Sequence, residues 1–203
     1  MNYLAHTLLS TTAIDFQLAN LAADALKSRP WSGCSQQHRQ GLLMHRRIDS
    51  FTDSSPYVQQ AKSRLGRGYL KGVVVDILFD HFLSQHWAQF VRCDFDTFIS
   101  DFYQAARQQA QHLPPAGQAF IARVVRYDFL HLYGDFSVLP KVLGKFDRRL
   151  SPRLRKRESA SDYLPALTAN YAALEQDFLV FFPTLITLFL VHSQAEPDKH
   201  YFF

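Results

Sequence analysis

The hydrophobic residues of this chain recur mainly three to four positions apart, the spacing that places them on one face of a helix. Signals for strands are sparse, because no Asn-Gly hairpin turn occurs and few segments alternate between apolar and polar residues. The β-branched run 73–75 lies inside a longer apolar stretch, residues 69–90, that also has helical spacing. The pattern therefore predicts an all-α protein, a compact single-domain bundle of roughly seven to nine helices.

Proline and glycine residues indicate where these helices begin and end. The residue before a proline avoids helical angles, so the first helix should end before Arg29 and Pro30. Pro56 suits the first turn of a short helix, and Gly66 and Gly68 separate that helix from the next. The expected helices cover residues 12–28, 35 to about 54, 56–65, 69–90, 94–112, 114–131, 136–150 and 159–192, the last with a break at Pro183. The second of them passes through Asp49 and ends near Ser54, Ser55 and Pro56.

Two apolar segments have some features of membrane-spanning or export signals. Residues 178–191 form a stretch of about 14 residues that contains Pro183 and falls short of the ~20 needed to cross a bilayer, so we predict a buried helix. His6 interrupts the short apolar stretch near the N-terminus, which has no basic residue ahead of it and does not fit a secretory signal.

The two cysteines, Cys34 and Cys93, are far apart and lack partners at metal-ligand spacing, so neither a disulfide framework nor a zinc site is indicated. We expect a cytoplasmic protein with no membrane partner.

The length and composition show that the chain can bury a hydrophobic core, and the net charge indicates what kind of partner it favours. The 203 residues are 47% hydrophobic and include 18 Phe, enough to bury a core without disulfides. The net charge of +4 and the pI near 9.1 favour an acidic partner. Nucleic acid, a phosphorylated metabolite and an acidic protein all meet that condition, so the charge does not choose among them.

Candidate chemistry lies in three pairs of polar residues, each pair four positions apart within an apolar stretch, so that both members should share a helix face. The pairs are Asn20 and Asp24, His45 and Asp49, and Asp76 and Asp80, with His81 adjoining the third. Singly, Asp24 or Asp49 fits a helix cap, and His45 fits a hydrogen-bonded core histidine. Together they favour a divalent metal, because buried carboxylates need a compensating cation. Oxygen ligands with a few imidazoles suit Mn²⁺ or Mg²⁺, and Arg46 and Arg47 follow His45 as candidates to hold phosphate.

Four motifs resemble those of the acyl carrier protein phosphodiesterase family, in the same order and with similar spacing. They are Met1-Asn2-Tyr3-Leu4-Ala5-His6, Ala19-Asn20-Leu21-Ala22-Ala23-Asp24, Gly41-Leu42-Leu43-Met44-His45-Arg46-Arg47-Ile48-Asp49 and Asp80-His81-Phe82-Leu83. The resemblance is densest over residues 1–90. One departure is Ala19, where we expect glycine, which indicates slightly different packing between the first helix and its neighbour.

The resemblance implies a fold and an activity. The family is regarded as a divergent relative of the HD-type metal phosphohydrolases, so an HD-domain-like helical fold is expected. A metal-activated water would cleave the phosphodiester between 4′-phosphopantetheine and a serine of holo-acyl carrier protein. The resemblance makes Asn20 the residue that orients a ligand and Arg46 a phosphate binder. Its catalytic candidates are Asp24, His45, Asp80 and His81, and its metal-ligand candidates are Asp24, His45, Asp76, Asp80, His81, His6 and Asp49.

A dense group of cations lies later in the chain, around a helix end and connector broken by Ser151 and Pro152. Its members are Lys145, Arg148, Arg149, Arg153, Arg155, Lys156 and Arg157. Taken alone, so many cations are most simply explained as a surface loop exposed to solvent. Because acyl carrier proteins are acidic, the resemblance makes this segment a docking surface, with substrate-binding candidates Arg148, Arg149, Arg155 and Arg157. Aromatic residues that stack on bases are not interleaved here, so nucleic acid is not the expected partner.

Two other functions stay open on the sequence. One is an HD-like phosphohydrolase that acts on a nucleotide and needs no carrier protein. The other is a non-catalytic helical module that binds carrier protein and has lost its metal. The retained acidic pairs argue against the module, because buried carboxylates without a cation destabilise a fold. We therefore expect a metal-dependent phosphodiesterase.

Overall fold

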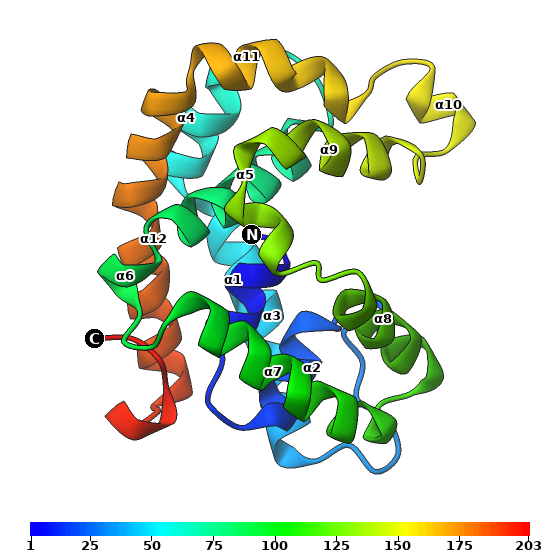
Figure 1. The fold of residues 1–203 in the computed structure, drawn as a ribbon, viewed down its shortest axis with the longest axis vertical. Coiled ribbons are helices and arrows are strands. Elements are labelled where there is room, and N and C mark those ends of the chain that lie inside the picture. The colour runs from blue at the N-terminus through cyan, green and yellow to red at the C-terminus, as the bar shows by residue number, and fades with distance from the viewer.

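The computed structural model describes residues 1–203 and consists almost entirely of helices joined by short turns (Figure 1). The only strand-like pairing is an isolated antiparallel bridge between Val91 and Phe202, so the predicted all-α class is confirmed. The elements in order are α1 (Tyr3–Leu8), α2 (Ile14–Leu21), α3 (Gln36–Ser54), α4 (Pro56–Arg64), α5 (Lys71–Gln85), α6 (Trp87–Phe90), α7 (Phe95–Gln109), η1 (Ala110–His112), α8 (Pro115–Arg126), η2 (His131–Gly134), η3 (Phe136–Val138), α9 (Leu139–Asp147), α10 (Pro152–Arg155), η4 (Ala160–Tyr163), α11 (Leu164–Ala169), α12 (Tyr171–Ser193) and η5 (Pro197–Lys199), where η marks a 3₁₀ helix.

One continuous hydrophobic core of 50 buried residues holds these helices together. Phenylalanines from α5 and α12 meet in it: the ring centroids of Phe79 and Phe178 lie 5.5 Å apart, and those of Phe82 and Phe178 lie 5.9 Å apart. Figure 1 shows α12, drawn in orange to red, along one side of the molecule beside α4. The long α12 therefore supports the middle helices, on which the polar residues of the sequence motifs lie.

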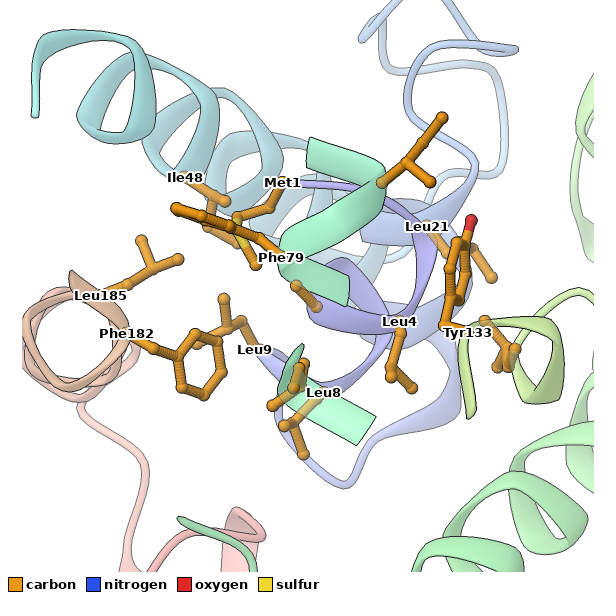
Figure 2. Close-up of a cluster of buried hydrophobic side chains, with 14 of the residues drawn as sticks. Met1, Leu4, Leu8, Leu9, Leu21, Ile48, Phe79, Tyr133, Phe182 and Leu185 are labelled. Carbon is orange, nitrogen blue, oxygen red and sulfur yellow. The ribbon is translucent and has the colours of Figure 1, made fainter. Parts of the chain in front are cut away.

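The short helix α1 lies at the centre of this core. Figure 2 shows Leu9 of this N-terminal segment beside Phe182 of α12, and Leu4 on the other side of the segment beside Tyr133. Leu4, Leu8 and Leu9 are all fully buried. Since burying one such side chain contributes roughly 1.5–3 kcal/mol, packing rather than intrinsic helix propensity stabilises a helix of only six residues.

The N-terminus of α1 is capped by a residue from a distant part of the sequence. The buried Asp80 carboxylate of α5 accepts hydrogen bonds from the backbone N–H groups of Leu4 (2.7 Å), Ala5 (3.2 Å) and Asn2 (3.4 Å). These N–H groups have no partner within the helix, so a carboxylate is well placed to satisfy them. Asp80 thereby fixes α1, and with it His6, against α5.

Helices α2 and α3 make the most extensive helix–helix contact of the fold. Gly41 permits it, because a Cβ atom at this position would overlap the carbonyl oxygen of Phe16 and lie 3.0 Å from the side chain of Ala19. The position before Asn20, where a glycine was expected, holds Ala19, and Gly41 of α3 faces this alanine. The close approach brings the Asn20 region of α2 against His45 of α3.

The N-terminal region differs from the single helix predicted over residues 12–28. Helix α2 ends at Leu21, and residues 22–28 form turns in which Lys27 and Ser28 have positive φ angles of 53° and 48°. Left-handed residues cannot continue an α-helix. Asp24 therefore lies on a turn after α2, and not on the helix face that its spacing from Asn20 predicted.

Other predicted limits also shift. The stretch 69–90 divides at His86 into α5 and α6, and the segment 136–150 shortens to η3 and α9. The helix predicted from about residue 35 to near Ser54 is confirmed as α3, and Ser35 caps its start by accepting a hydrogen bond from the backbone N–H of His38. The helix predicted over 159–192 is divided into η4, α11 and α12, and the helix predicted over 114–131 ends at Arg126 as α8. The helices predicted over 56–65 and 94–112 lie within a few residues of α4 and α7.

The predicted break at Pro183 is wrong, because α12 runs without interruption from Tyr171 to Ser193. Phe182 and Leu185, on either side of the proline, are both fully buried, so core packing holds the helix through a residue that lacks an N–H donor. By length and composition α12 could also cross a membrane, a property that core helices of soluble proteins share. Its buried residues include Phe178, Phe181 and Phe189, which lie in the predicted stretch 178–191.

The close contact of α2 and α3 makes a prediction for Gly41→Ala. We expect the added methyl group to force α2 away from α3 and to destabilise the protein by about 1–3 kcal/mol, despite the better helix propensity of alanine. Thermal unfolding followed by circular dichroism measures this. The matched control is Gly72→Ala in α5, whose Cβ would make only an ordinary 3.5 Å contact with Lys62. Equal stability of the two variants would contradict the packing argument.

Candidate metal centre and active site

Three side chains from two helices converge on one point. His6 of α1 and His45 and Asp49 of α3 place a ring nitrogen or carboxylate oxygen each within 4.8 Å of one another. His6 Nε2 lies 3.2 Å from Asp49 Oδ1, and His45 Nε2 lies 3.1 Å from Asp49 Oδ2. The two imidazole rings stack with centroids 4.2 Å apart. We call these three residues the His-His-Asp group.

Asn20 orients both histidines of this group. Its amide nitrogen donates to the Leu9 carbonyl (2.9 Å) and to Ser10 Oγ (3.0 Å), so its Oδ1 faces His6 Nδ1 as an acceptor at 3.0 Å. Its backbone carbonyl accepts a hydrogen bond from His45 Nδ1 at 2.8 Å. Both rings therefore carry a proton on Nδ1 and direct Nε2 toward Asp49.

This orientation fits the residues to a divalent cation. Metal-binding histidines usually donate their second ring N–H to a carbonyl or carboxylate, which fixes the ring and leaves the other nitrogen for the ion. Asn20 provides that interaction twice, and Asp49 contributes a carboxylate oxygen opposite both Nε2 atoms. Two imidazoles with one carboxylate form a mixed donor set that first-row divalent ions accept.

A second carboxylate, that of Asp24, lies beside the His-His-Asp group, with its Oδ1 3.3 Å from His45 Nε2. Its side chain is 92% exposed, whereas the side chains of His6 and His45 are only 5% exposed. Asp24 therefore stands at the solvent side of the His-His-Asp group. The turn that replaces the last part of the predicted first helix puts it there.

The carboxylates set the charge state of the histidines. Burial alone would lower the pKa of His45, but its hydrogen bonds to Asp24 and Asp49 outweigh burial and raise that pKa to about 9. Burial dominates at His6 and lowers its pKa below the ordinary value. Burial would raise the pKa of Asp49, yet hydrogen bonds from His45 and His6 hold it well below its usual range. The hydrogen bond from His45 likewise lowers the pKa of Asp24.

The His-His-Asp group opens into a cavity of about 540 Å³, which we call the polar cavity. Asp24 and Asp76 line it together with the group, and Arg123 of α8 lies at its wall. Asp76 Oδ1 forms an ion pair with the buried Met1 amino group at 2.9 Å. The polar cavity therefore combines acidic, imidazole and cationic groups within reach of one ligand.

The structure does not bring Asp80 or His81 into this group. Asp80 is turned to the N-terminus of α1, and burial raises its pKa to about 7 against the three backbone N–H groups that favour its charged form. His81 Nδ1 donates to the Tyr133 carbonyl at 2.7 Å, and its Nε2 meets the Tyr171 hydroxyl at 2.9 Å. Neither residue lines the polar cavity.

The arginines near the site are arranged differently from the sequence expectation. Arg46 and Arg47 follow His45 directly, but residues one and two positions apart point to different sides of a helix, and neither lines the polar cavity. Arg123 does line it, although nothing in its local sequence indicated a role. Its contribution depends on how α8 packs, which short-range patterns do not reveal.

The predicted docking segment is well exposed. The four candidate arginines of this segment are all on the surface, and none of its seven cations forms an ion pair with a carboxylate. The nearby acids are occupied elsewhere: Asp147 accepts backbone hydrogen bonds from Ala160 and Ser161, and Glu158 accepts from Leu70. Figure 1 shows α10, in yellow, projecting at the edge of the molecule. The segment 145–157 thus presents unneutralised positive charge.

Comparison with known proteins shows the family of this chain. Residues 1–185 match the family model described as acyl carrier protein phosphodiesterase. The chain belongs to this family. The acyl carrier protein phosphodiesterase of Yersinia pestis is 33% identical over 92% of this chain and 96% of its own length, and that of Escherichia coli O157:H7 has the same identity and coverage. The corresponding protein of Pectobacterium atrosepticum is 30% identical over 93% and 97%. No solved structure matches the chain significantly.

Family membership confirms the resemblance that the sequence motifs carried. The match extends well beyond residues 1–90, where the motifs are densest, and takes in most of α12. All the helices that form the His-His-Asp group and its supports lie inside the matched region. The three residues of the group thus lie within the part of the chain that matches the family model.

The raised pKa of His45 makes a prediction for the pH dependence of stability. A folded-state pKa of about 9 against an ordinary value of 6.5 means that this stabilisation is fully present below pH 6.5 and is lost as the pH rises through 9. With chelator present, the free energy of unfolding of wild type should fall by up to about 1.4 kcal/mol per pH unit across this window. Urea titrations of His45→Gln should lack this slope, whereas the exposed His192→Gln should keep it. An unchanged slope in His45→Gln would refute the assignment.

Proposed function

We propose that this protein hydrolyses the phosphodiester that links 4′-phosphopantetheine to a serine of holo-acyl carrier protein, giving apo-acyl carrier protein and 4′-phosphopantetheine. The observation that supports this most directly is the His-His-Asp group, oriented by Asn20 and open to the polar cavity. The names of the relatives support the carrier protein as substrate.

We propose that the His-His-Asp group holds a divalent cation, preferably Mn²⁺ with Mg²⁺ as the alternative. His6 Nε2, His45 Nε2 and a carboxylate oxygen of Asp49 are the ligands in this proposal, and Asn20 keeps both rings in register. When bound, the cation neutralises phosphoryl oxygens and makes a nearby water more acidic. Asp24, exposed beside His45, is the residue placed to accept a proton from the attacking water.

The other candidates take supporting roles in this proposal. Asp76 lines the polar cavity and is a further candidate ligand for the cation, although its Oδ1 already forms an ion pair with the Met1 amino group. Asp80 positions His6 by capping α1, and His81 ties α5 to Tyr133 and Tyr171. Arg123 is better placed than Arg46 or Arg47 to bind a phosphate oxygen.

We propose that the basic segment 145–157 receives the acidic carrier protein in the cytoplasm. Its exposed cations lack carboxylate partners within the chain, so they are free to pair with a partner's acids. Complementary charge of this kind mainly speeds association and fixes orientation. Lys145 and Arg149, at the start of this segment, lie close enough to the centre of the molecule to line a cavity that adjoins the polar cavity.

The first prediction of this proposal concerns activity. Purified protein incubated with holo-acyl carrier protein and Mn²⁺ should remove the phosphopantetheine mass from the carrier, and chelator should stop the reaction. Asp49→Asn and His45→Gln should lower kcat by about 100-fold or more, because each removes a proposed ligand while preserving shape. Mass spectrometry of the carrier measures this, and the exposed Asp96→Asn on α7 is the matched control.

Other outcomes would favour the alternatives. Hydrolysis of nucleotides but not of holo-carrier would point to an HD-like nucleotide hydrolase. Binding of holo-carrier with no turnover under any divalent metal would point to a non-catalytic module. Full activity of Asp49→Asn would reject the proposed ligand set while leaving the activity in place.

The second prediction concerns the docking surface. Arg155→Glu with Arg157→Glu should raise KM for holo-carrier by about tenfold at low salt, leave kcat nearly unchanged, and reduce the dependence of the rate on ionic strength. Steady-state kinetics at two salt concentrations measure this. The control, Arg29→Glu with Arg39→Glu, makes the same charge change on exposed arginines outside the segment. An equal effect of both pairs would mean that only net charge matters.

A further inference from the structure

A second cavity adjoins the polar cavity. Its volume is about 280 Å³, and it lies between α5, α9 and the segment around η2. We call it the apolar cavity, because its walls are mainly apolar side chains. They include Val73 and Ile77 of α5, Val142 and Phe146 of α9, and Phe129 and Tyr133 before and within η2.

The two cavities share one border. Met1, Asn2, Tyr3, Asp24 and Asp76 line both of them. A ligand whose phosphate lies at the His-His-Asp group therefore has one direct route into an apolar space. A linear chain attached to that phosphate would pass between Asp24 and Asp76 to reach it.

The chemistry of the apolar cavity is selective. Lys145 and Arg149 line it as donor-only side chains, whereas Asp24 and Asp76 at its border are acceptors. Its volume lies near the lower end of the range for small-molecule sites, roughly 300–1,000 Å³, which suits a narrow chain and excludes a folded polypeptide segment. The ligand should be linear and largely apolar, with a few amide or hydroxyl groups.

We propose that the apolar cavity binds the pantetheine arm of the carrier protein while the phosphodiester lies at the His-His-Asp group, an inference that rests on the proposed function. The arm consists of a dimethyl-substituted carbon, a hydroxyl, two amides and a thiol in one chain. Its methyl and methylene groups pack on Val73, Val142 and Phe146, and its amide carbonyls accept hydrogen bonds from Lys145 and Arg149. The protein thus recognises the arm that stays attached to the phosphate in the product, as well as the phosphate itself.

The test fills the apolar cavity without touching the His-His-Asp group. Val142→Trp on α9 and Val73→Trp on α5 each place an indole in it from a different wall. Both should lower kcat/KM for holo-carrier by about tenfold or more, while hydrolysis of bis(p-nitrophenyl) phosphate, which has no arm, changes by less than about twofold. Val125→Trp, in a separate hollow between α7 and α8, is the matched control and should leave both rates unchanged. Circular dichroism melting identifies any variant that fails to fold.

Binding gives a readout that does not need turnover. Isothermal titration calorimetry with pantetheine, which lacks the phosphate, should detect binding to wild type that Val142→Trp weakens by about tenfold. Binding of inorganic phosphate should be the same in both. Wild-type activity of both Trp variants on holo-carrier, or no binding of pantetheine to wild type, would overturn the proposal. Pantetheine binding by a wild-type protein that leaves holo-carrier intact would sustain the arm site and reject the hydrolytic function.

Discussion

The fully buried amide of Asn20 is the interaction on which the site depends. Its side chain reaches three partners, at Leu9, Ser10 and His6, and its backbone carbonyl reaches a fourth at His45. A buried polar group is stable only when its hydrogen bonds are made, so these contacts hold α1, α2 and α3 in one arrangement. The two Nε2 atoms face Asp49 because the Nδ1 atom of each ring is held by an oxygen of Asn20. The rest of the fold serves to keep these three helices at that spacing.

Two further contacts maintain the spacing from outside the site. Gly41 lets α2 approach α3 closely, which puts the Asn20 carbonyl within reach of His45. Asp80 accepts hydrogen bonds from the free backbone N–H groups of α1 and so fixes the position of His6 relative to α5. A carboxylate buried in this way is costly unless it is hydrogen-bonded, and the three backbone donors meet that need. Asp80 was a metal-ligand candidate on its spacing from Asp76, but its role in the structure is to cap the N-terminus of α1.

The sequence allowed the fold class, most helices and part of the site to be predicted. Periodicity suffices for long helices such as α3, and a spacing of four correctly paired His45 with Asp49. The sequence could not reveal α1, because its cap comes from Asp80, over seventy residues away. It also could not show that Lys27 and Ser28 turn the chain and move Asp24 off the helix. Arg123 was missed for the same reason, since its place in the polar cavity follows from the packing of α8.

The charges of the site would couple binding of the proposed cation to substrate binding. With His45 protonated, His6 neutral, and Asp24 and Asp49 ionised, the four residues carry net negative charge at neutral pH. A phosphodiester is an anion, so this state repels it. A divalent cation at the Nε2 atoms would displace the His45 proton, and the four residues together with the cation would then be neutral overall. The carboxylates that stabilise the imidazolium are thus the ones that would favour the cation, and the affinity for phosphate should rise only as the cation binds.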